Sequence, residues 1–183
     1  FFSIKEKKSE KKMETTSIKD MFSALFHNDQ AMLTVITIVL INSALYITSN
    51  LILYFFKYDL GTELWKNNYT LFTTIGGATQ ILGMMVLYPV LRNKLSNTTI
   101  FKTSLCMAIF GYALLLFASF MNLAHNMVIL CLIGALVFSA NGMLSVLTTV
   151  FLSTSVDYGE MKTGRREESV IFSMQTFVVK AAS

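Results

Sequence analysis

The sequence predicts an all-α fold, a polytopic bundle of membrane-spanning helices, and three observations support this prediction. Hydrophobic residues make up 54% of the 183 residues and charged residues only 14%, whereas soluble chains carry about 25% charged residues. The charges are clustered. Between the clusters lie four long blocks without a charged residue: 31–56, 69–91, 103–124 and 126–156. Each block exceeds the roughly 18 apolar residues that indicate a spanning helix.

The first 29 residues are a distinct, polar part of the chain. Residues 3–16 are rich in Lys, Glu, Ser and Thr, which favours a cytoplasmic loop. Ser17 followed by Asp20 is a helix-start signal. Apolar residues then recur at helical spacing: Ile18, Met21, Phe22, Leu25 and Phe26. We therefore expect 1–29 to be a cytoplasmic loop containing an amphipathic helix in the membrane interface. A helical extension of the first span is the alternative.

Residues 30–183 are expected to form the membrane domain. The apolar segments predict spans at about 30–56, 68–91, 99–121 and 127–153, and an incomplete span at 169–183. The last segment gives about 22 Å of helix, which is short of a hydrocarbon layer about 30 Å thick. We therefore expect the chain to be a piece of a larger membrane protein.

The basic residues predict the orientation of the spans. Twelve Lys and Arg residues fall in 1–29, 92–102 and 157–168, against two, Lys57 and Lys66, in the alternate connections. The positive-inside rule places the first three segments in the cytoplasm. We expect a multi-pass membrane protein. This topology accounts for the net charge of +4, so no nucleic-acid partner is expected.

Polar side chains recur at helical spacing on four of the spans. These faces comprise Asn42, Tyr46, Asn50 and Tyr54 on the first span, Thr73, Gly77 and Gln80 on the second, Asn141, Ser145, Thr148 or Thr149 and Ser153 on the fourth, and Ser169, Ser173, Thr176 and Lys180 on the last. Within a membrane such faces either line a polar cavity or make hydrogen bonds between helices. The third span has few polar groups, which predicts packing or lipid contact.

Lys180 is the one charged residue in the apolar segment 169–183. It lies about twelve helical residues beyond the charged loop, or roughly 18 Å, near the middle of the hydrocarbon layer. A cation at that depth costs at least about 2.5–3.5 kcal/mol. Lys180 is therefore expected to face a polar cavity or a partner.

The segment 157–168 carries seven charged residues before the last span. It is expected to be a cytoplasmic loop. In one interpretation it is solvated, with exposed ion pairs worth about 0–1 kcal/mol each. In the other it is a gate whose charges pair with another domain in one conformation and separate in the other.

The residues point to no catalytic or cofactor site. No Gly-rich phosphate loop, nucleophile with a base, or pair of carboxylates at membrane depth occurs in the sequence. The spacing of His, Cys, Asp and Glu suits no metal, and Cys106 and Cys131 lie in separate spans. We therefore expect neither an enzyme nor a resident cofactor or metal.

The sequence also resembles a known family of carriers. The segments VDYGE (156–160), KTGRREES (162–169) and SMQTFVVK (173–180) resemble the signature of the glycoside–pentoside–hexuronide cation symporters, which include the melibiose permease and belong to the major facilitator superfamily. The match is specific over 156–183 and looser but collinear from the interfacial helix onward. The resemblance implies that the chain is a C-terminal half, from the central loop through helices seven to ten and part of eleven.

The resemblance also implies roles for particular residues. Lys180 matches a helix-eleven lysine needed for transport, and Asp157 and Arg166 match charged positions of the cytoplasmic loop and gate. The chain departs from the melibiose permease at Thr154, where that protein has an acid, and at Ser145, where it has a tryptophan. The second departure puts galactoside recognition in doubt. The family's cation ligands lie in the N-terminal half, outside this chain.

These observations lead to one functional hypothesis. The chain is expected to belong to a symporter of the bacterial inner (plasma) membrane that moves a sugar or glycoside with Na⁺ or H⁺. It is expected to work by alternating access within the lipid bilayer and to be completed by a missing N-terminal half. The expected substrate-binding residues are Asn42, Tyr46, Asn50, Gln80, Ser145, Thr149, Ser173, Thr176 and Lys180. The expected cytoplasmic gate comprises Asp157, Tyr158, Glu160, Arg165, Arg166 and Glu168. The alternatives are a non-transporting membrane sensor or scaffold, and a carrier of a different solute.

Overall fold

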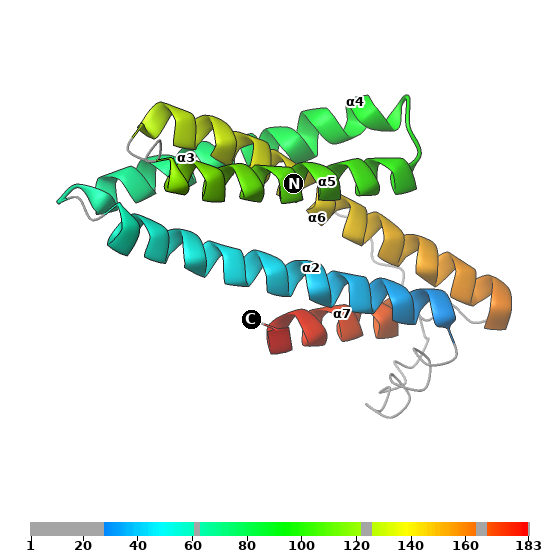
Figure 1. Cartoon of the computed structure of the whole chain (residues 1–183). Coiled ribbons are helices and arrows are strands. Elements are labelled where there is room, and N and C mark those ends of the chain that lie inside the picture. Colours follow the sequence, from blue (N-terminus) through cyan, green and yellow to red (C-terminus); the bar gives the residue numbers. More distant parts are fainter. Residues whose placement is uncertain (1–27, 61–62, 122–125, 164–167, 183) are drawn as a thin grey trace, which may run out of the picture.

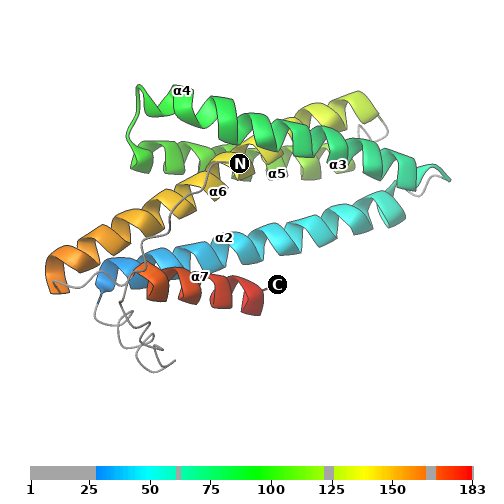
Figure 2. The same ribbon diagram turned by 180° about the vertical axis from the view of Figure 1, so that it is seen from behind.

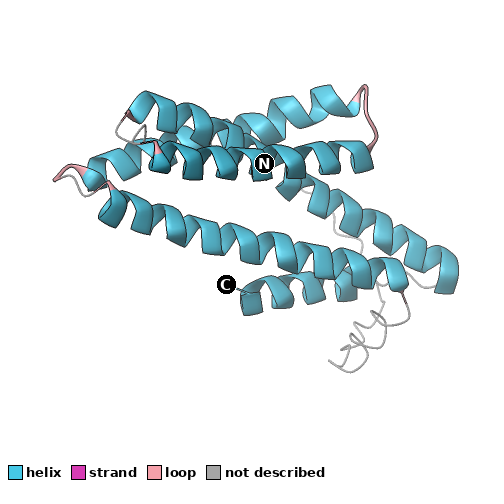
Figure 3. Ribbon diagram, in the orientation of Figure 1, coloured by secondary structure: helices cyan, strands magenta, loops and turns pink. Residues whose placement is uncertain are grey.

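The computed structural model describes residues 28–60, 63–121, 126–163 and 168–182, and its regular structure there is entirely helical (Figure 3). The interfacial helix expected near Ile18 lies outside the described residues. The elements are α2 (Asp29–Tyr54), the π-helical turn η1 (Phe55–Asp59), α3 (Trp65–Leu82), the π-helical turn η2 (Gly83–Leu87), α4 (Tyr88–Arg92), α5 (Asn97–Phe120), α6 (Met127–Thr163) and α7 (Glu168–Ala182).

Among the described residues, four helical rods are long and apolar enough to cross a membrane. They cover Asp29–Asp59, Trp65–Arg92, Asn97–Phe120 and Met127–Lys162. α7 has 15 described residues and corresponds to the predicted fifth segment, 169–183. The chain is therefore a membrane protein with the predicted all-α fold, a helical bundle.

Short polar side chains define where two of the rods begin. Asn28 precedes α2, and its Oδ1 accepts a hydrogen bond from the Ala31 backbone N–H at 3.0 Å. Ser96 precedes α5, and its Oγ accepts from the Thr99 N–H at 3.3 Å. Such caps satisfy N–H groups that lack a partner in the first helical turn.

The second rod changes its helical pitch where Pro89 approaches. In the π-helical turn η2 the Tyr88 N–H donates to the Gly83 carbonyl, a bond that spans five residues. Pro89 has no N–H, so it leaves a carbonyl of the preceding turn without its helical donor. The π-helical turn accommodates this missing bond within a continuous rod, α3–η2–α4.

α6 is the centre of the bundle. It runs diagonally between α3 and α5 on one side and α2 and α7 on the other (Figures 1 and 2). Its 37 residues include the fully buried Ala140, Leu147 and Leu152. Each of the four apolar clusters among the described residues contains α6 residues in its buried core: one joins α2, α6 and α7, one joins η1, α3 and α6, and the other two join α5 and α6. Every other described long helix is therefore positioned by its contact with α6.

Glycines allow the backbones of the second rod and α6 to touch. A Cβ atom at Gly83 would lie 2.5 Å from the Ser139 carbonyl oxygen, and one at Gly142 would overlap the Gln80 carbonyl oxygen. Small residues of this kind permit close helix approach in membranes. The bundle is thus held most closely at the crossing of these two rods.

The charged segment after the fourth span is helical further than expected. α6 continues through Thr163, so Asp157, Tyr158 and Glu160 lie on its last turns and not in a loop. The charge cluster marks where the helix leaves the hydrocarbon layer. It does not end the helix, since residues 154–163 contain no proline that would interrupt helical hydrogen bonding. The expected loop assignment was wrong for this part of the segment.

Candidate functional site

α7 separates an apolar face from a polar one. Ile171 is 3% exposed and packs in the cluster with α2 and α6, and Phe172 and Val179 pack against that cluster. Ser173, Thr176 and Lys180 are exposed. The spacing of i, i+3 and i+7 places these three on one side of a helix. The predicted α7 candidates therefore lie away from the packed cluster.

The α2 and α6 candidates are also accessible in this chain. On α2, Asn42 is half-buried, and Tyr46 and Asn50 are exposed. On α6, Ser145 is half-buried and Thr149 is exposed. α2, α6 and α7 meet at one apolar cluster, formed by Ala31, Val35, Ile38, Leu152, Val156 and Ile171. Eight of the nine candidates thus come from three helices that pack together.

Gln80 has different surroundings. It is half-buried on α3, and its carbonyl oxygen lies against Gly142 of α6. Gly142 is about 15 Å along α6 from Leu152, at 1.5 Å per residue, and Leu152 belongs to the cluster that contains α7. The structure thus places Gln80 at the contact between α3 and α6, apart from that cluster.

Most of the candidate polar groups donate a hydrogen bond to their own helix. Asn42 Nδ2 donates to the Ile38 carbonyl at 2.8 Å and Asn50 Nδ2 to the Tyr46 carbonyl at 2.8 Å. The same pattern holds for three hydroxyls: Ser145 to Asn141 at 3.0 Å, Thr149 to Ser145 at 3.3 Å and Thr176 to Phe172 at 3.0 Å.

This pattern determines what the faces offer to a ligand. A Ser or Thr hydroxyl whose proton is used within its helix retains lone pairs, so it accepts hydrogen bonds. Asparagine retains its Oδ1 acceptor as well. A lysine ammonium supplies donors only. Acceptors on α2 and α6 together with donors on α7 are complementary to a ligand with many hydroxyl groups.

The gate candidates are divided between two helices. Asp157 and Glu160 are exposed on the last turns of α6, and Tyr158 is half-buried. Glu168 is the first residue of α7 and is exposed. Arg165 and Arg166 lie outside the described residues. Close by in the sequence, Lys162 Nζ forms an exposed ion pair with Asp29 of α2 at 3.4 Å.

Two interhelical hydrogen bonds involve residues that periodicity did not single out as partners. Asn141 Nδ2 of α6 donates to the Tyr112 hydroxyl of α5 at 3.1 Å, and Asn141 is 7% exposed. Ser119 Oγ of α5 donates to Asp59 Oδ2 at 2.7 Å. Asn141 was predicted as part of a polar stripe, but the structure uses it to join helices. Two of the polar groups of the third span, Tyr112 and Ser119, therefore join helices.

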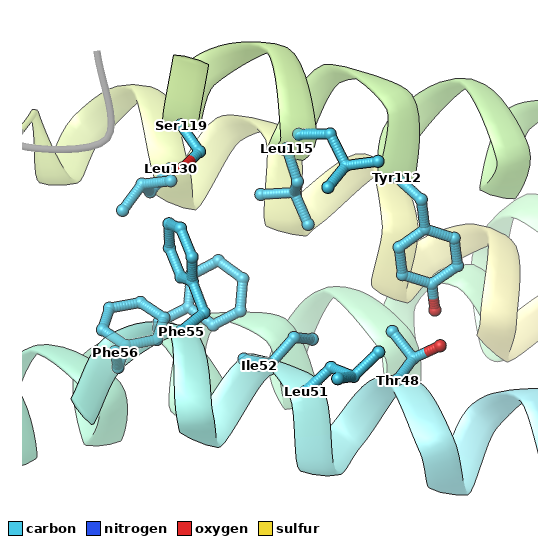
Figure 4. A pocket seen from close by; sticks show the side chains of 11 residues that line it. Thr48, Leu51, Ile52, Phe55, Phe56, Tyr112, Leu115, Ser119 and Leu130 are labelled. Atoms are coloured by element: carbon cyan, nitrogen blue, oxygen red, sulfur yellow. The ribbon is translucent and has the colours of Figure 1, made fainter. Parts of the chain in front are cut away.

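A cavity of about 360 Å³ opens between α2 and α5 (Figure 4). Apolar side chains such as Leu51, Phe55 and Leu115 form most of its lining. The Tyr112 hydroxyl and Thr48 lie at one end and Ser119 at the other (Figure 4). A sugar needs a hydrogen-bond partner for most of its hydroxyls, so this apolar cavity is distinct from the candidate sugar-binding faces.

The fold and the polar faces together define a class of protein: a polytopic helical membrane protein whose apolar helices carry faces suited to a hydroxyl-rich solute. Comparison with known proteins then identifies the family. The family described as "MFS/sugar transport protein" matches residues 2–183. The chain therefore belongs to this family of the major facilitator superfamily, as the resemblance implied.

Individual relatives agree with this assignment. The chain is 28% identical over 173 residues to a lactose permease of Lactobacillus helveticus, a match that covers 92% of the chain and 25% of the relative. It is 29% identical over 167 residues to a lactose permease of Leuconostoc lactis (90% and 24%). It is 26% identical over 172 residues to a raffinose carrier protein of Pediococcus pentosaceus (92% and 25%). The chain thus spans about a quarter of the length of these relatives.

Proposed function

We propose that this chain is part of a secondary active transporter that moves a sugar or glycoside across the cell inner membrane with Na⁺ or H⁺. The observation that carries the proposal is the match to a sugar-transport family over residues 2–183. The relatives are named for lactose and raffinose, so a di- or trisaccharide is the first substrate class to test.

The proposed substrate site uses the accessible polar faces of α2, α6 and α7. Lys180 supplies donors to sugar hydroxyls, and it pairs with carboxylates contributed by the N-terminal half of the transporter. Ser145, Thr149 and Thr176 accept hydrogen bonds, since their protons are used within their own helices. The coupling cation binds in the N-terminal half, and the cycle requires no enzymatic step and no resident cofactor.

The proposed cycle is alternating access. The two halves rock around a site near the middle of the membrane, as in other carriers built from repeated halves. Residues 1–29, 92–102 and 157–168 lie on the cytoplasmic side in this proposal. The charges of 157–168, including Arg165 and Arg166, pair with the N-terminal half when the inner side is closed and separate when it opens.

The test is sugar uptake by the full-length protein in proteoliposomes. Counterflow of labelled lactose and raffinose is measured with and without Na⁺ and with an imposed pH gradient. The proposal predicts saturable uptake that one of the two cations stimulates, and loss of uptake in the Lys180→Ala variant at normal membrane levels. Unimpaired uptake by that variant would remove Lys180 from the site. If the full-length protein binds sugar but never transports it, the result would favour a sensor or scaffold.

A further inference from the structure

Asn28 makes two contacts with different helices at once. Its Oδ1 caps α2 by accepting from the Ala31 N–H at 3.0 Å, and its Nδ2 donates to the Ser155 carbonyl of α6 at 3.0 Å. Asn28 and Ser155 are 4% and 2% exposed. A buried amide with both of its ends bonded is held in one orientation. The same side chain therefore fixes the start of α2 and the end of α6.

The residues around Asn28 are shaped to admit this bridge. Gly159, one turn beyond Ser155, leaves open the space that Asn28 Nδ2 occupies, and a Cβ atom there would overlap that nitrogen. The Ser155 hydroxyl also bonds the Thr34 hydroxyl of α2 at 2.8 Å. In Figures 1 and 2 the start of α2 and the end of α6 lie at the same end of the bundle.

The bridge sets the rotation of the charged end of α6. Ser155 and Gly159 are four residues apart, so they share the face that meets α2. Asp157 and Glu160 are exposed, so they do not share that buried face. A helix held on one face presents its other residues in a fixed direction. Without the hydrogen bond from Asn28 to the Ser155 carbonyl, the end of α6 can therefore rotate, and the direction in which Asp157 and Glu160 point is no longer fixed.

We infer that Asn28 is a positioning residue for transport: it holds the last turns of α6 so that Asp157 and Glu160 meet their partners when the inner side closes. This inference rests on the proposed function, because it assigns Asn28 to the conformational step of the same cycle. It concerns the rate of that step and not the affinity for sugar, since the candidate sugar ligands lie further along the helices.

Asn28→Asp separates the two contacts. An aspartate at this position still caps α2, because a carboxylate oxygen accepts from a backbone N–H. Its other oxygen is an acceptor and cannot bond the Ser155 carbonyl. Thr154→Ala is the matched control, because Thr154 is an exposed neighbour on α6 whose hydroxyl donates only to Val150 of its own helix among the described residues.

The experiment uses the full-length transporter with Cys106 and Cys131 replaced. Sugar uptake is measured together with maleimide labelling of a Val156→Cys variant, since Val156 is 2% exposed in the cluster with α2 and α7. In the Asn28→Asp background we expect the maximal uptake rate to fall, and labelling to accelerate, by about three- to tenfold, the range for a lost buried hydrogen bond. KM should stay within about twofold of the parent by the same reasoning, since no ligand contact changes.

A second pair of variants separates the bond from simple packing. Gly159→Ala forces Asn28 aside and should reduce uptake as Asn28→Asp does. Adding Asn28→Ser to Gly159→Ala makes room for the new methyl group but does not restore the hydrogen bond to the Ser155 carbonyl. Uptake by this double variant should therefore remain low.

Each contrary result overturns the inference. The inference is wrong if Asn28→Asp takes up sugar or is labelled at the rate of the parent, or if Thr154→Ala has as large an effect as Asn28→Asp. It is also wrong if Asn28→Asp changes KM but leaves the maximal rate unchanged. Full recovery of uptake in the double variant Asn28→Ser/Gly159→Ala would contradict it as well. A parent that transports no sugar refutes the proposed function instead, and the labelling rates then still decide whether Asn28 holds α6.

Discussion

Gly142→Ala is the substitution whose cost the structure defines most directly. A Cβ atom at Gly142 would overlap the Gln80 carbonyl oxygen and lie 3.2 Å from Met84 Cγ. The Gln80 carbonyl belongs to the backbone of a packed helix and cannot rotate away, so α3 and α6 must separate. Overpacking of this kind costs about 1–3 kcal/mol. Alanine recovers about 1 kcal/mol of helix propensity, so we expect a net loss of about 0–2 kcal/mol.

Gly77→Ala is the matched control. Gly77 lies on the partner helix α3, and a Cβ atom there has no described atom within 4 Å. Only the propensity gain remains, so this variant should be neutral or more stable by up to about 1 kcal/mol. Gly83→Ala meets backbone at Ser139 and should behave like Gly142→Ala. At Gly134, the ring of Phe72 is the obstacle, and a side chain yields more easily than backbone.

The assay is reversible unfolding of the purified chain in detergent micelles, followed by circular dichroism. We expect Gly77→Ala to be at least as stable as the parent, and Gly142→Ala and Gly83→Ala to be less stable than it. If Gly142→Ala and Gly77→Ala were equally stable, the close contact between α3 and α6 would not exist in the folded protein.

Three further predictions concern polar contacts within the bundle. A double-mutant cycle of Asn141→Leu and Tyr112→Phe should give a coupling of about 0.6 kcal/mol, the average for interhelical hydrogen bonds in membranes, and a coupling of zero would contradict the bond between α5 and α6. Ser104→Ala should leave stability unchanged or raise it by up to about 1–3 kcal/mol, because Ser104 Oγ is buried and bonds no described residue; a clear loss of stability would show a partner. Lys162→Ala should change stability by no more than about 1 kcal/mol, because its ion pair with Asp29 is exposed, and a larger loss would mean that the pair is shielded from solvent.

Composition was sufficient to predict the fold class. A long uncharged block that crosses a membrane must satisfy its backbone hydrogen bonds within itself, as an α-helix does. The four uncharged blocks correspond to the four rods of the bundle. The end of α6 was harder to predict. The cluster beginning at Asp157 was expected to be a loop, yet helical hydrogen bonding continues to Thr163. Charge marks where a helix leaves the hydrocarbon layer and not where the helix ends.

The candidate site was only partly predictable for a related reason. Spacing identifies which residues share a face, but it does not say what that face meets. On α7 the predicted polar face is exposed. On α6, which is surrounded by helices, the stripe divides: Asn141 turns to Tyr112 and Thr149 is exposed. The bridge from Asn28 to Ser155 joins residues 127 positions apart, and no local pattern indicates such a pair.

The proposed transport requires the polar face of α7 to border the path of the solute, and thiol labelling at this face tests that requirement. Thr176 and Phe177 are adjacent and both exposed in this chain, but they lie about 100° apart around the helix. In the full-length protein, Thr176→Cys should react with a hydrophilic, membrane-impermeant thiol reagent, and the transported sugar should slow that reaction, whereas Phe177→Cys should react only with apolar reagents. If Thr176→Cys instead resisted the hydrophilic reagent and Phe177→Cys accepted it, the solute path would lie on a different face of the helix.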